Sequence, residues 1–520
     1  MPQASGATPI GQRRAVTRPS KAEVKHWVRA LWPWLLSALF FLFYLSTLAP
    51  TVLWGDDAGF QRAAFTGELP ADGSGHWLWL QAARLFARLP WGDIAFRVNL
   101  LSAVAAAATL LVLYLAARAL ELSEMGATVA VVSLAVGHTF WMHAVRAEVY
   151  TVFTLFLALL LLLVARWRRG DNRAIYVAAA LFGTTLLAHQ MALLLLPAAA
   201  FLLWQRRRWL TRRAWLLLML AALLGLLPFF AVVSSQIAAR ADVSLPVALR
   251  LYFTHAGVDF APAFFDFAPH TLLVDVGMWI GFLGLQFVGL AFLLGIWGIV
   301  DRLSGAHPAL WNALFLLYLT DVFFAISYRV NDRYVFFLPG YLVFALFAGA
   351  GWEAAWRALR RRFSPGPLFA AVGLALLVLA PLVSYYSVPR LLVAAGANPL
   401  GIRTLPGREP NTFFLWPGKA EYRGAADYGW QTLAALADEA VLIADHTPLE
   451  TLRYLQVVEG LREDVTLVKI EPGQDLAPLV AAQEANRPIY LAADDPAYYN
   501  LRNLRGLQLL PEGPVFRLQR

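Results

Sequence analysis

The sequence predicts a mainly α-helical, polytopic membrane protein with a small α/β domain at its C-terminal end. Hydrophobic residues make up 59% of the 520 residues and charged residues only 15%, whereas soluble domains have about 25% charged and about 45–50% apolar residues. The apolar residues fall in runs of about 20, the length that an α-helix needs to cross the hydrocarbon core. From about residue 390 onward, polar residues and turn formers return.

The apolar runs predict about eleven transmembrane helices. They are expected at 33–53, 95–118, 126–143, 149–165, twice within 174–204, and at 214–234, 276–299, 309–327, 335–352 and 368–387. The run 174–204 is too long for one span, so we divide it at His189-Gln190. The first run is too long for the core of a signal peptide and is interpreted as a retained span.

The distribution of arginine predicts the orientation in the membrane. The net charge of +9 could indicate a nucleic-acid partner, but the Arg clusters flank apolar runs, as they do in loops on the cytoplasmic side. With eleven spans, every Arg-dense segment falls on that side: 13–29, 166–173, 206–213 and 357–362. We therefore expect a multi-pass protein of the cell's inner (plasma) membrane, with the lipid bilayer and no nucleic acid as a partner, a cytoplasmic N-terminus and an extracytoplasmic C-terminus. The chain has no cysteine, which excludes disulfides and thiolate metal sites.

Three regions follow from this pattern: a flexible basic cytoplasmic tail (1–30), a transmembrane domain (31–389) and an extracytoplasmic α/β domain (390–520). In the last region we expect strands and helices in alternation: strand 441–444, helix 448–459 with Thr447 as N-cap, strand 465–470, helix 476–485 and strand 489–492. This order predicts a small parallel or mixed sheet. The region has no glycine-rich phosphate loop, which favours a structural or acceptor-binding role over catalysis.

Two adjacent carboxylates, Asp56 and Asp57, directly follow the first predicted span. Carboxylates beside hydrocarbon are costly and often functional, so the pair indicates an active site on the outer face; the alternative is two solvated loop acids. Later in the same loop, 76–89 has the spacing of an amphipathic helix in the interface.

The other outer loops contribute further candidates for the same site. They supply His76, Arg146 and Glu148, His189, Arg240 and Arg250, and Arg329, Asp332 and Arg333. Asp321, inside a predicted span, is a functional candidate by position, although an ion pair with an Arg on a neighbouring helix is the interpretation that we favour.

A lipid-phosphate substrate would suit these residue types. Arg binds phosphate through two parallel hydrogen bonds. A carboxylate can deprotonate an incoming hydroxyl, and paired carboxylates can alternatively hold a divalent cation. The sequence does not decide between these two roles.

Several stretches, in order along nearly the whole chain, resemble the protein O-mannosyltransferase-like family of GT-C glycosyltransferases, the group that includes transmembrane protein 260. The similar stretches are 54–60 (WGDDAGF), 92–100 (GDIAFRVNL), Phe140-Trp141 with 147–150 (AEVY), His189 with 194–197 (LLLP), Asp332 with 337–342 (FLPGYL), and 454–460 (YLQVVEG) before Asp464-Val465.

The resemblance implies a GT-C fold and inverting transfer of a sugar, mannose in this family, from a polyprenyl-phosphate-linked donor to a Ser or Thr hydroxyl of an exported protein. It places the general base on Asp57, with Asp56 beside it. Glu148, His189, Asp332 and His76 would line the sugar or acceptor pocket. Donor phosphate contacts would come from Arg146, Arg329 and Arg333, with Arg240 and Arg250 behind them.

The chain also departs from the family pattern. Phe60 replaces the acidic residue of the first-loop motif, and the family's His-Pro-Pro-Gly segment is replaced by 71–76, which keeps one histidine but loses the prolines. A transporter or flippase of lipid-linked sugars is the alternative function, although such proteins usually contain internal repeats and polar residues near the midplane. A non-catalytic scaffold for the outer domain is a third interpretation.

Overall fold

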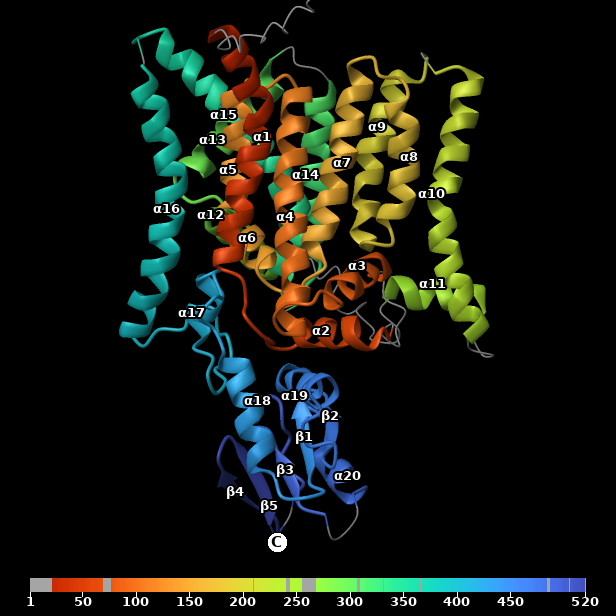
Figure 1. Cartoon of the computed structure of the whole chain (residues 1–520), viewed down its shortest axis with the longest axis vertical. Helices are drawn as coiled ribbons and strands as arrows, with labels where there is room; N and C mark the ends of the chain where they lie inside the picture. The colour runs from red at the N-terminus through yellow and green to blue at the C-terminus, as the bar shows by residue number, and fades with distance from the viewer. Residues whose placement is uncertain are drawn as a thin grey trace, which may run out of the picture.

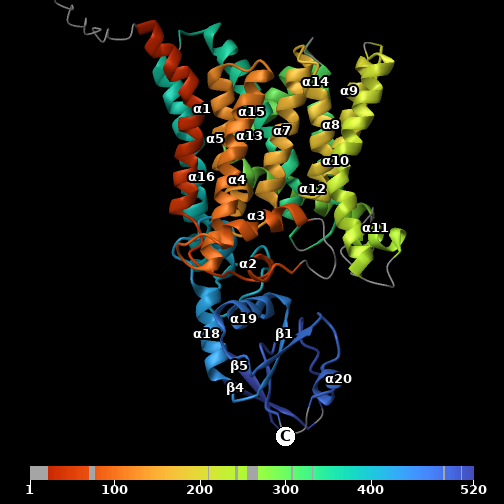
Figure 2. The ribbon, with the colours of Figure 1, turned by 45° about the vertical axis from the view of Figure 1, so that its right-hand side comes forward.

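The computed structural model describes residues 21–68, 76–208, 210–239, 244–254, 268–305, 309–330, 332–364, 366–483, 487–504 and 506–519. A bundle of long helices carries a small α/β domain at one end, and short helices lie between the two (Figures 1 and 2). The mainly α-helical architecture with a small C-terminal α/β domain, expected from the sequence, is confirmed.

The bundle contains long helices together with several short ones. They are α1 (Lys21–Ser46), α4 (Ile94–Ala119), α5 (Glu124–Ala135), α6 (His138–Ala144), α7 (Tyr150–Arg168), α8 (Ala174–Thr185), η1 (Gln190–Leu195), α9 (Leu196–Arg206), α10 (Arg212–Ala239), α12 (Pro269–Gln286), α13 (Leu290–Ser304), α14 (Ala309–Ser327), η3 (Arg333–Phe337), α15 (Leu338–Arg360) and α16 (Pro367–Ala394). Within the described residues, seven helices are long and apolar enough to cross a membrane, or up to nine if each bent pair is one span. Two shorter apolar helices, 174–185 and 190–206, would bring the number to eleven, which stays a prediction.

Two of the expected spans are broken. The span expected at 126–143 consists of α5 and α6, which meet at 69°, and the one at 276–299 consists of parts of α12 and α13, which meet at 114°. A break inside a membrane frees backbone groups that must find partners. Gln286 Oε1 accepts hydrogen bonds from the backbone of Thr139 (2.8 Å) and Phe140 (3.4 Å), and the Tyr385 hydroxyl donates to Leu285 O (2.6 Å). Gln286, at the end of α12, thus satisfies backbone groups at the start of α6, and Tyr385 of α16 satisfies a carbonyl group near the end of α12.

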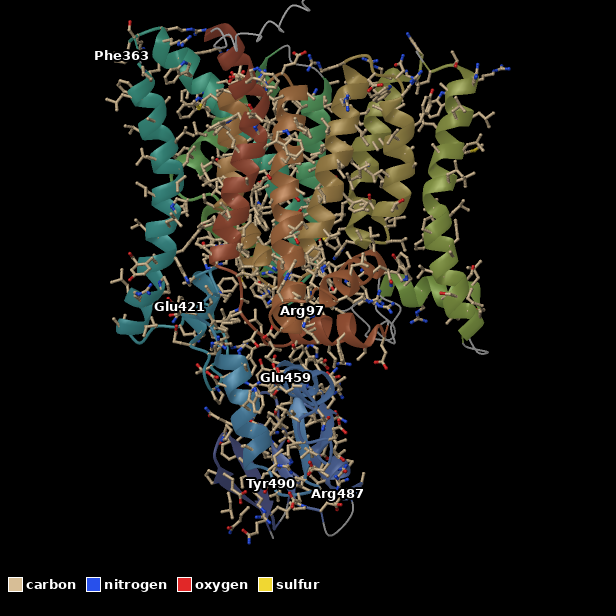
Figure 3. The ribbon with its side chains drawn as sticks, in the orientation of Figure 1. Arg97, Phe363, Glu421, Glu459, Arg487 and Tyr490 are labelled. Atoms are coloured by element: carbon tan, nitrogen blue, oxygen red, sulfur yellow. The ribbon has the colours of Figure 1, made fainter. Side chains whose placement is uncertain are left out.

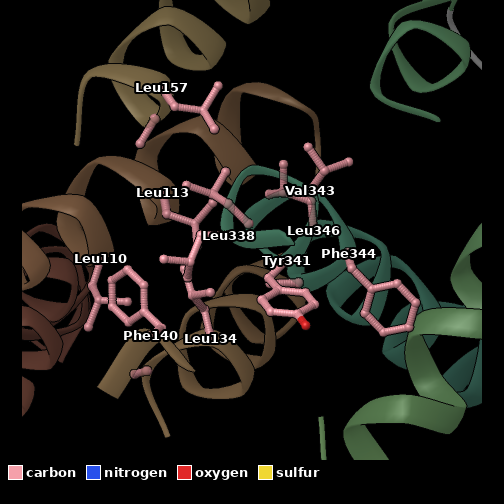
Figure 4. Close-up of a cluster of buried hydrophobic side chains, with 14 of the residues drawn as sticks. Leu110, Leu113, Leu134, Phe140, Leu157, Leu338, Tyr341, Val343, Phe344 and Leu346 are labelled. Carbon is pink, nitrogen blue, oxygen red and sulfur yellow. The ribbon is translucent and has the colours of Figure 1, made fainter. Parts of the chain in front are cut away.

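Small residues let the central helices approach closely. A Cβ added at Gly298 of α13 would lie 1.8 Å from Phe347 O, and one at Gly351 of α15 would lie 1.8 Å from Leu294 O. Close backbone approach of this kind drives helix association where lipid offers no hydrophobic gain. Around α15, apolar side chains of α4, α5, α6 and α7 fill the centre of the bundle (Figure 4).

The Arg-rich connections α7–α8, α9–α10 and α15–α16 lie on the face of the bundle opposite the α/β domain (Figure 1). On the α/β-domain face lie α2 (Asp56–Thr66), α3 (Trp77–Ala87) and α11 (Leu245–Thr254). The helix expected at 76–89 is confirmed as α3. The charge asymmetry therefore matches the two faces of the bundle.

The α/β domain has a five-stranded mixed sheet in the order β2-β1-β3-β5-β4. Its elements are α17 (Pro410–Leu415), α18 (Gly424–Ala435), β1 (Val441–Asp445), α19 (His446–Glu459), β2 (Thr466–Ile470), α20 (Leu476–Ala481), β3 (Ile489–Leu491), β4 (Gln508–Glu512) and β5 (Val515–Gln519). β1 is parallel to β2 and β3, in register Val441–Thr466 and Val441–Ile489, and β5 is antiparallel to both β3 and β4. The three expected strands are confirmed, whereas β4 and β5 were not anticipated. The N-cap of α19 is Asp445 and not Thr447.

Candidate functional site

The first-loop motif forms the start of α2, on the α/β-domain face of the bundle. Gly55 has φ 60° and ψ −126°, a conformation that favours glycine and lets the chain turn sharply into the helix. Asp56 and Asp57 occupy the first turn of α2, where the helix dipole favours negative charge. Their surroundings differ: Asp57 is 1% exposed, whereas the Asp56 side chain is 60% exposed. Asp57 therefore does not face open water.

Asp57, Arg146 and Glu148 form a buried charged group. Arg146 Nε lies 3.0 Å from Asp57 Oδ1, and Arg146 Nη2 lies 2.8 Å from Glu148 Oε1. Burial raises the pKa of both carboxyl groups, and Arg146 opposes the shift only in part. The pKa of Arg146 is raised despite its burial, because both acids favour the cation. One guanidinium serves two acids, so the group has one negative charge when both acids are ionised.

Asp56 contacts the α/β domain. His446, the first residue of α19, has its Nε2 2.8 Å from Asp56 Oδ1. Burial acts to raise the pKa of Asp56, but the hydrogen bond and charge of His446 outweigh it and hold the pKa below its ordinary value. The accessible carboxylate is therefore ionised at neutral pH.

Lys419 is a buried cation close to the same charges. Its Nζ donates to the carbonyl oxygens of Trp416 (2.5 Å) and Pro417 (3.3 Å), and its backbone N–H donates to Thr47 O at the end of α1. Burial, followed by the positive charge of Arg146, lowers the pKa of Lys419 to about 7, and Asp57 opposes this shift.

His76 and His189 lie together beside the carboxylates. Their ring centroids are 5.0 Å apart, and the His189 ring is 5.3 Å from Tyr150. His189 Nδ1 accepts a hydrogen bond from Met191 N, so the proton of the neutral ring is on Nε2. The charge of His76 also contributes to the low pKa of Asp56. The structure thus brings both histidines to the side of the site that faces α3.

Arg329 and Arg333 share one buried acid, Asp275 of α12. Arg329 Nη2 donates to Asp275 Oδ2 and Arg333 Nη1 to Asp275 Oδ1, each at 2.7 Å. Asp275 of α12 therefore holds both guanidinium groups in place. Asp332, between them in sequence, is exposed, yet the surrounding protein and then the charge of Asp56 raise its pKa to about 6. Its pKa thus depends in part on the charge of Asp56, in the first turn of α2.

The remaining expected residues are farther from this centre or outside the described ranges. Arg250 is exposed on α11, and Arg240 lies outside the described residues. The ion pair favoured for Asp321 is not what the structure has: Asp321 Oδ2 accepts from the backbone N–H of Gly340 at 2.9 Å. No group of three or more His, Asp or Glu side chains in the described part of the chain is arranged to hold a metal ion.

Sequence reasoning missed His446, Lys419 and Asp275. His446 directly follows a buried strand, and the carboxyl ends of parallel strands are frequent functional positions. Asp275 lies in a strongly apolar stretch, the same signal that singled out Asp321. Lys419 had no comparable signal, because only the fold brings its loop under α1.

The chain was compared with known families, curated proteins and solved structures. Residues 71–212 match the model of the protein O-mannosyl-transferase TMEM260 N-terminal domain. No curated protein matches the chain. The fold is similar to that of ArnT from Cupriavidus metallidurans bound to undecaprenyl phosphate, with a TM-score of 0.56, 14% identity, and 94% of this chain and 97% of that chain covered. It is also similar to the Archaeoglobus fulgidus oligosaccharyltransferase in the apo form, with a TM-score of 0.51, 12% identity, and 90% and 70% of the two chains covered.

These likenesses agree with the resemblance of the sequence motifs. Because the match to ArnT covers 94% of this chain, it extends over both the helix bundle and the adjoining α/β domain (Figure 1). The chain is thus a multi-pass membrane protein with the GT-C glycosyltransferase fold, and its segment 71–212 matches the protein O-mannosyl-transferase TMEM260 family.

Proposed function

We propose that this chain is an inverting glycosyltransferase that moves a sugar from a polyprenyl-phosphate-linked donor to a hydroxyl group. The observation that carries the proposal is the position of the Asp56–Asp57 pair. It lies on the first helix after the first membrane span, near His76 and His189 and the two further acids Glu148 and Asp332. The ArnT structure with undecaprenyl phosphate supports a lipid-phosphate donor. The match to a protein O-mannosyl-transferase domain supports mannose as the sugar and a protein hydroxyl group as the acceptor. A Ser or Thr of an exported protein is the acceptor that the sequence resemblance implies.

Asp56 and Asp57 have different roles in this proposal because the side chain of Asp56 is exposed and that of Asp57 is buried. A general base must come within hydrogen-bond reach of the hydroxyl that it deprotonates. Asp56 is accessible and ionised, so we assign it the role of the general base, which accepts the proton of the acceptor hydroxyl. Asp57 would fix α2 through Arg146 and supply negative charge next to the reacting atoms. Asp57 itself, the base implied by the sequence resemblance, is the alternative, and it would require Arg146 to shift fully onto Glu148.

The donor phosphate is assigned to Arg329 and Arg333. Both guanidinium groups are held by the same buried carboxylate, and Arg is well suited to phosphate because it can donate two parallel hydrogen bonds. Arg146 is less suited to this role, since two carboxylates already occupy it. As the sugar leaves, the new phosphate charge would be stabilised by this Arg pair.

The proposal also includes the orientation of the protein in the membrane. The Arg-rich face would be cytoplasmic and the α/β-domain face extracytoplasmic. The lipid chain would then remain in the bilayer while its head group reaches Asp56 from the membrane side.

The test is incubation of the full-length protein, in bilayer nanodiscs, with radiolabelled polyprenyl-phospho-mannose and an exported acceptor protein. Transfer of label to the acceptor by the wild type is expected. Asp56→Asn should reduce transfer about 100-fold or more, the ordinary size of a general-base effect. If Asp57→Asn abolishes transfer while Asp56→Asn retains it, the base is Asp57. Lipid translocation without any product would instead favour a transporter, a function that gains no support from the comparisons.

A further inference from the structure

The α/β domain reaches the candidate active site through α19, which packs against α2. Gly55 N donates to Thr447 O at 3.1 Å, and the Thr451 hydroxyl donates to Leu53 O at 2.9 Å. Figure 3 labels Arg97 and Glu459 close to this junction, whereas Arg487 and Tyr490 lie in the domain farther from the bundle. The segment that leads into α2, just before Asp56, is thus hydrogen-bonded to α19 at two positions.

Buried polar contacts of the preceding residue, Asp445, fix the position of His446. The preceding residue, Asp445, is 2% exposed; it pairs with Arg403 at 2.9 Å and accepts from the Tyr499 hydroxyl at 2.8 Å. The Asp445 N–H donates in turn to the same hydroxyl. Since Asp445 ends β1 and precedes α19, these contacts hold the His446 backbone while leaving its ring 47% exposed.

The His446–Asp56 contact is too exposed to serve mainly for stability. Exposed ion pairs contribute about 0–1 kcal/mol. The same interface already contains the less exposed Arg62–Glu450 pair, at 2.8 Å, and the backbone bonds given above. The contact does, however, occupy only Oδ1 of Asp56, which leaves the second oxygen for another donor.

We propose that the α/β domain completes the active site, with His446 as a positioning residue that holds Asp56 in place to receive the acceptor hydroxyl. This inference rests on the proposed function and goes beyond it, because it gives a residue 390 positions from Asp56 in the sequence a part in setting the rate of the reaction. The proton of the hydroxyl passes to the free oxygen of Asp56, the hydroxyl oxygen bonds to the sugar, and the polyprenyl phosphate leaves with the electron pair of the broken bond. His446 keeps its own proton throughout.

The charges around His446 set the expected pH behaviour. Asp56 on α2 and Glu450 on α19 favour the imidazolium, whereas Lys469 on β2 opposes it. The balance raises the pKa of His446 above its ordinary value, chiefly through the hydrogen bond to Asp56. Loss of His446 should therefore let the pKa of Asp56 rise, and the acidic limb of the rate profile should move to higher pH.

The experiment compares His446→Ala, His446→Gln and Val457→Ala in the full-length protein, using polyprenyl-phospho-mannose and an exported acceptor. Val457 is an exposed residue of the same helix with no place in the site. We expect kcat to fall about tenfold in His446→Ala, with the KM for the donor unchanged and the acidic limb shifted upward. Gln can donate one hydrogen bond without a charge, so His446→Gln should recover part of kcat and keep the shifted limb. Val457→Ala should match the wild type.

Two outcomes overturn the inference in different ways. If both His446 variants have the kcat and pH profile of the wild type, His446 does not position Asp56, and the proposed function stands. If the wild type transfers no sugar from the lipid-linked donor, the proposed function fails and the inference fails with it. If His446→Ala does not fold, the pH profile of His446→Gln decides alone.

Discussion

Arg146 lies between two buried carboxylates and can fully neutralise only one of them. Burial favours the protonated form of Glu148 in the folded protein, which raises its pKa above the ordinary value of about 4. The folded state then holds more protons than the unfolded state between the ordinary and the raised pKa. Stability contributed by this group is therefore present at low pH and is lost as pH rises through the raised pKa.

Glu148→Gln should remove this pH dependence. Gln is neutral and can still accept a hydrogen bond from Arg146, so the variant resembles protonated Glu148. We expect its Tm in detergent to match that of the wild type at about pH 5 and to exceed it at about pH 9. Glu421→Gln, which changes an exposed carboxylate, is the control and should show no such gain. If the difference in Tm between Glu148→Gln and the wild type is the same at both pH values, the pKa of Glu148 is not raised in the folded protein.

At the scale of single elements, α13 and α15 approach so closely that side chains are excluded from part of the contact. A Cβ on Gly351 would lie 1.8 Å from a backbone oxygen of α13, which cannot rotate away. Gly351→Val should therefore separate the helices and cost about 1–3 kcal/mol, the usual penalty of overpacking. The measurement is the Tm of the purified protein in detergent.

Gly277→Val on α12 is the matched control for this contact. No atom lies within 4 Å of a Cβ at that position, and the residue is exposed. Its substitution should leave the Tm nearly unchanged, apart from the helix propensity of valine. If both variants lower the Tm by the same amount, the loss in Gly351→Val does not come from the close contact between α13 and α15.

The elements also show what the sequence can and cannot predict. Apolar length and Arg position located the membrane helices, because both reflect the bilayer directly. The breaks between α5 and α6 and between α12 and α13 were missed, because nothing in the sequence indicates that the Gln286 side chain accepts hydrogen bonds from the backbone of Thr139 and Phe140. The carboxylate pair was found from its place after a span, whereas His446 and Lys419 reach the site only through the docking of distant segments.

At the scale of the whole molecule, one buried acid joins the two domains. Glu450 of α19 is 6% exposed and contacts Arg62 of α2 at 2.8 Å and Arg453 at 2.9 Å. Burial opposes its ionisation, but the two guanidinium groups outweigh this and hold the pKa of Glu450 below its ordinary value. The stability that Glu450 contributes is therefore present above the ordinary carboxyl pKa and is lost as pH falls through the lowered one.

Glu450→Gln should loosen the α/β domain from the bundle at neutral pH without unfolding either part. Removing one charge of a mostly buried pair leaves Arg62 without its partner, at a cost of about 1–3 kcal/mol. Amide hydrogen exchange should rise in 56–66 and in the first turn of α19, while the α13–α15 contact keeps its protection, because local opening follows local contacts. Glu463→Gln, at an exposed site of the same domain, should leave exchange unchanged. If exchange instead becomes faster throughout the bundle, the bundle and the α/β domain unfold together as one cooperative unit, and loss of the α2–α19 contact is not a local event.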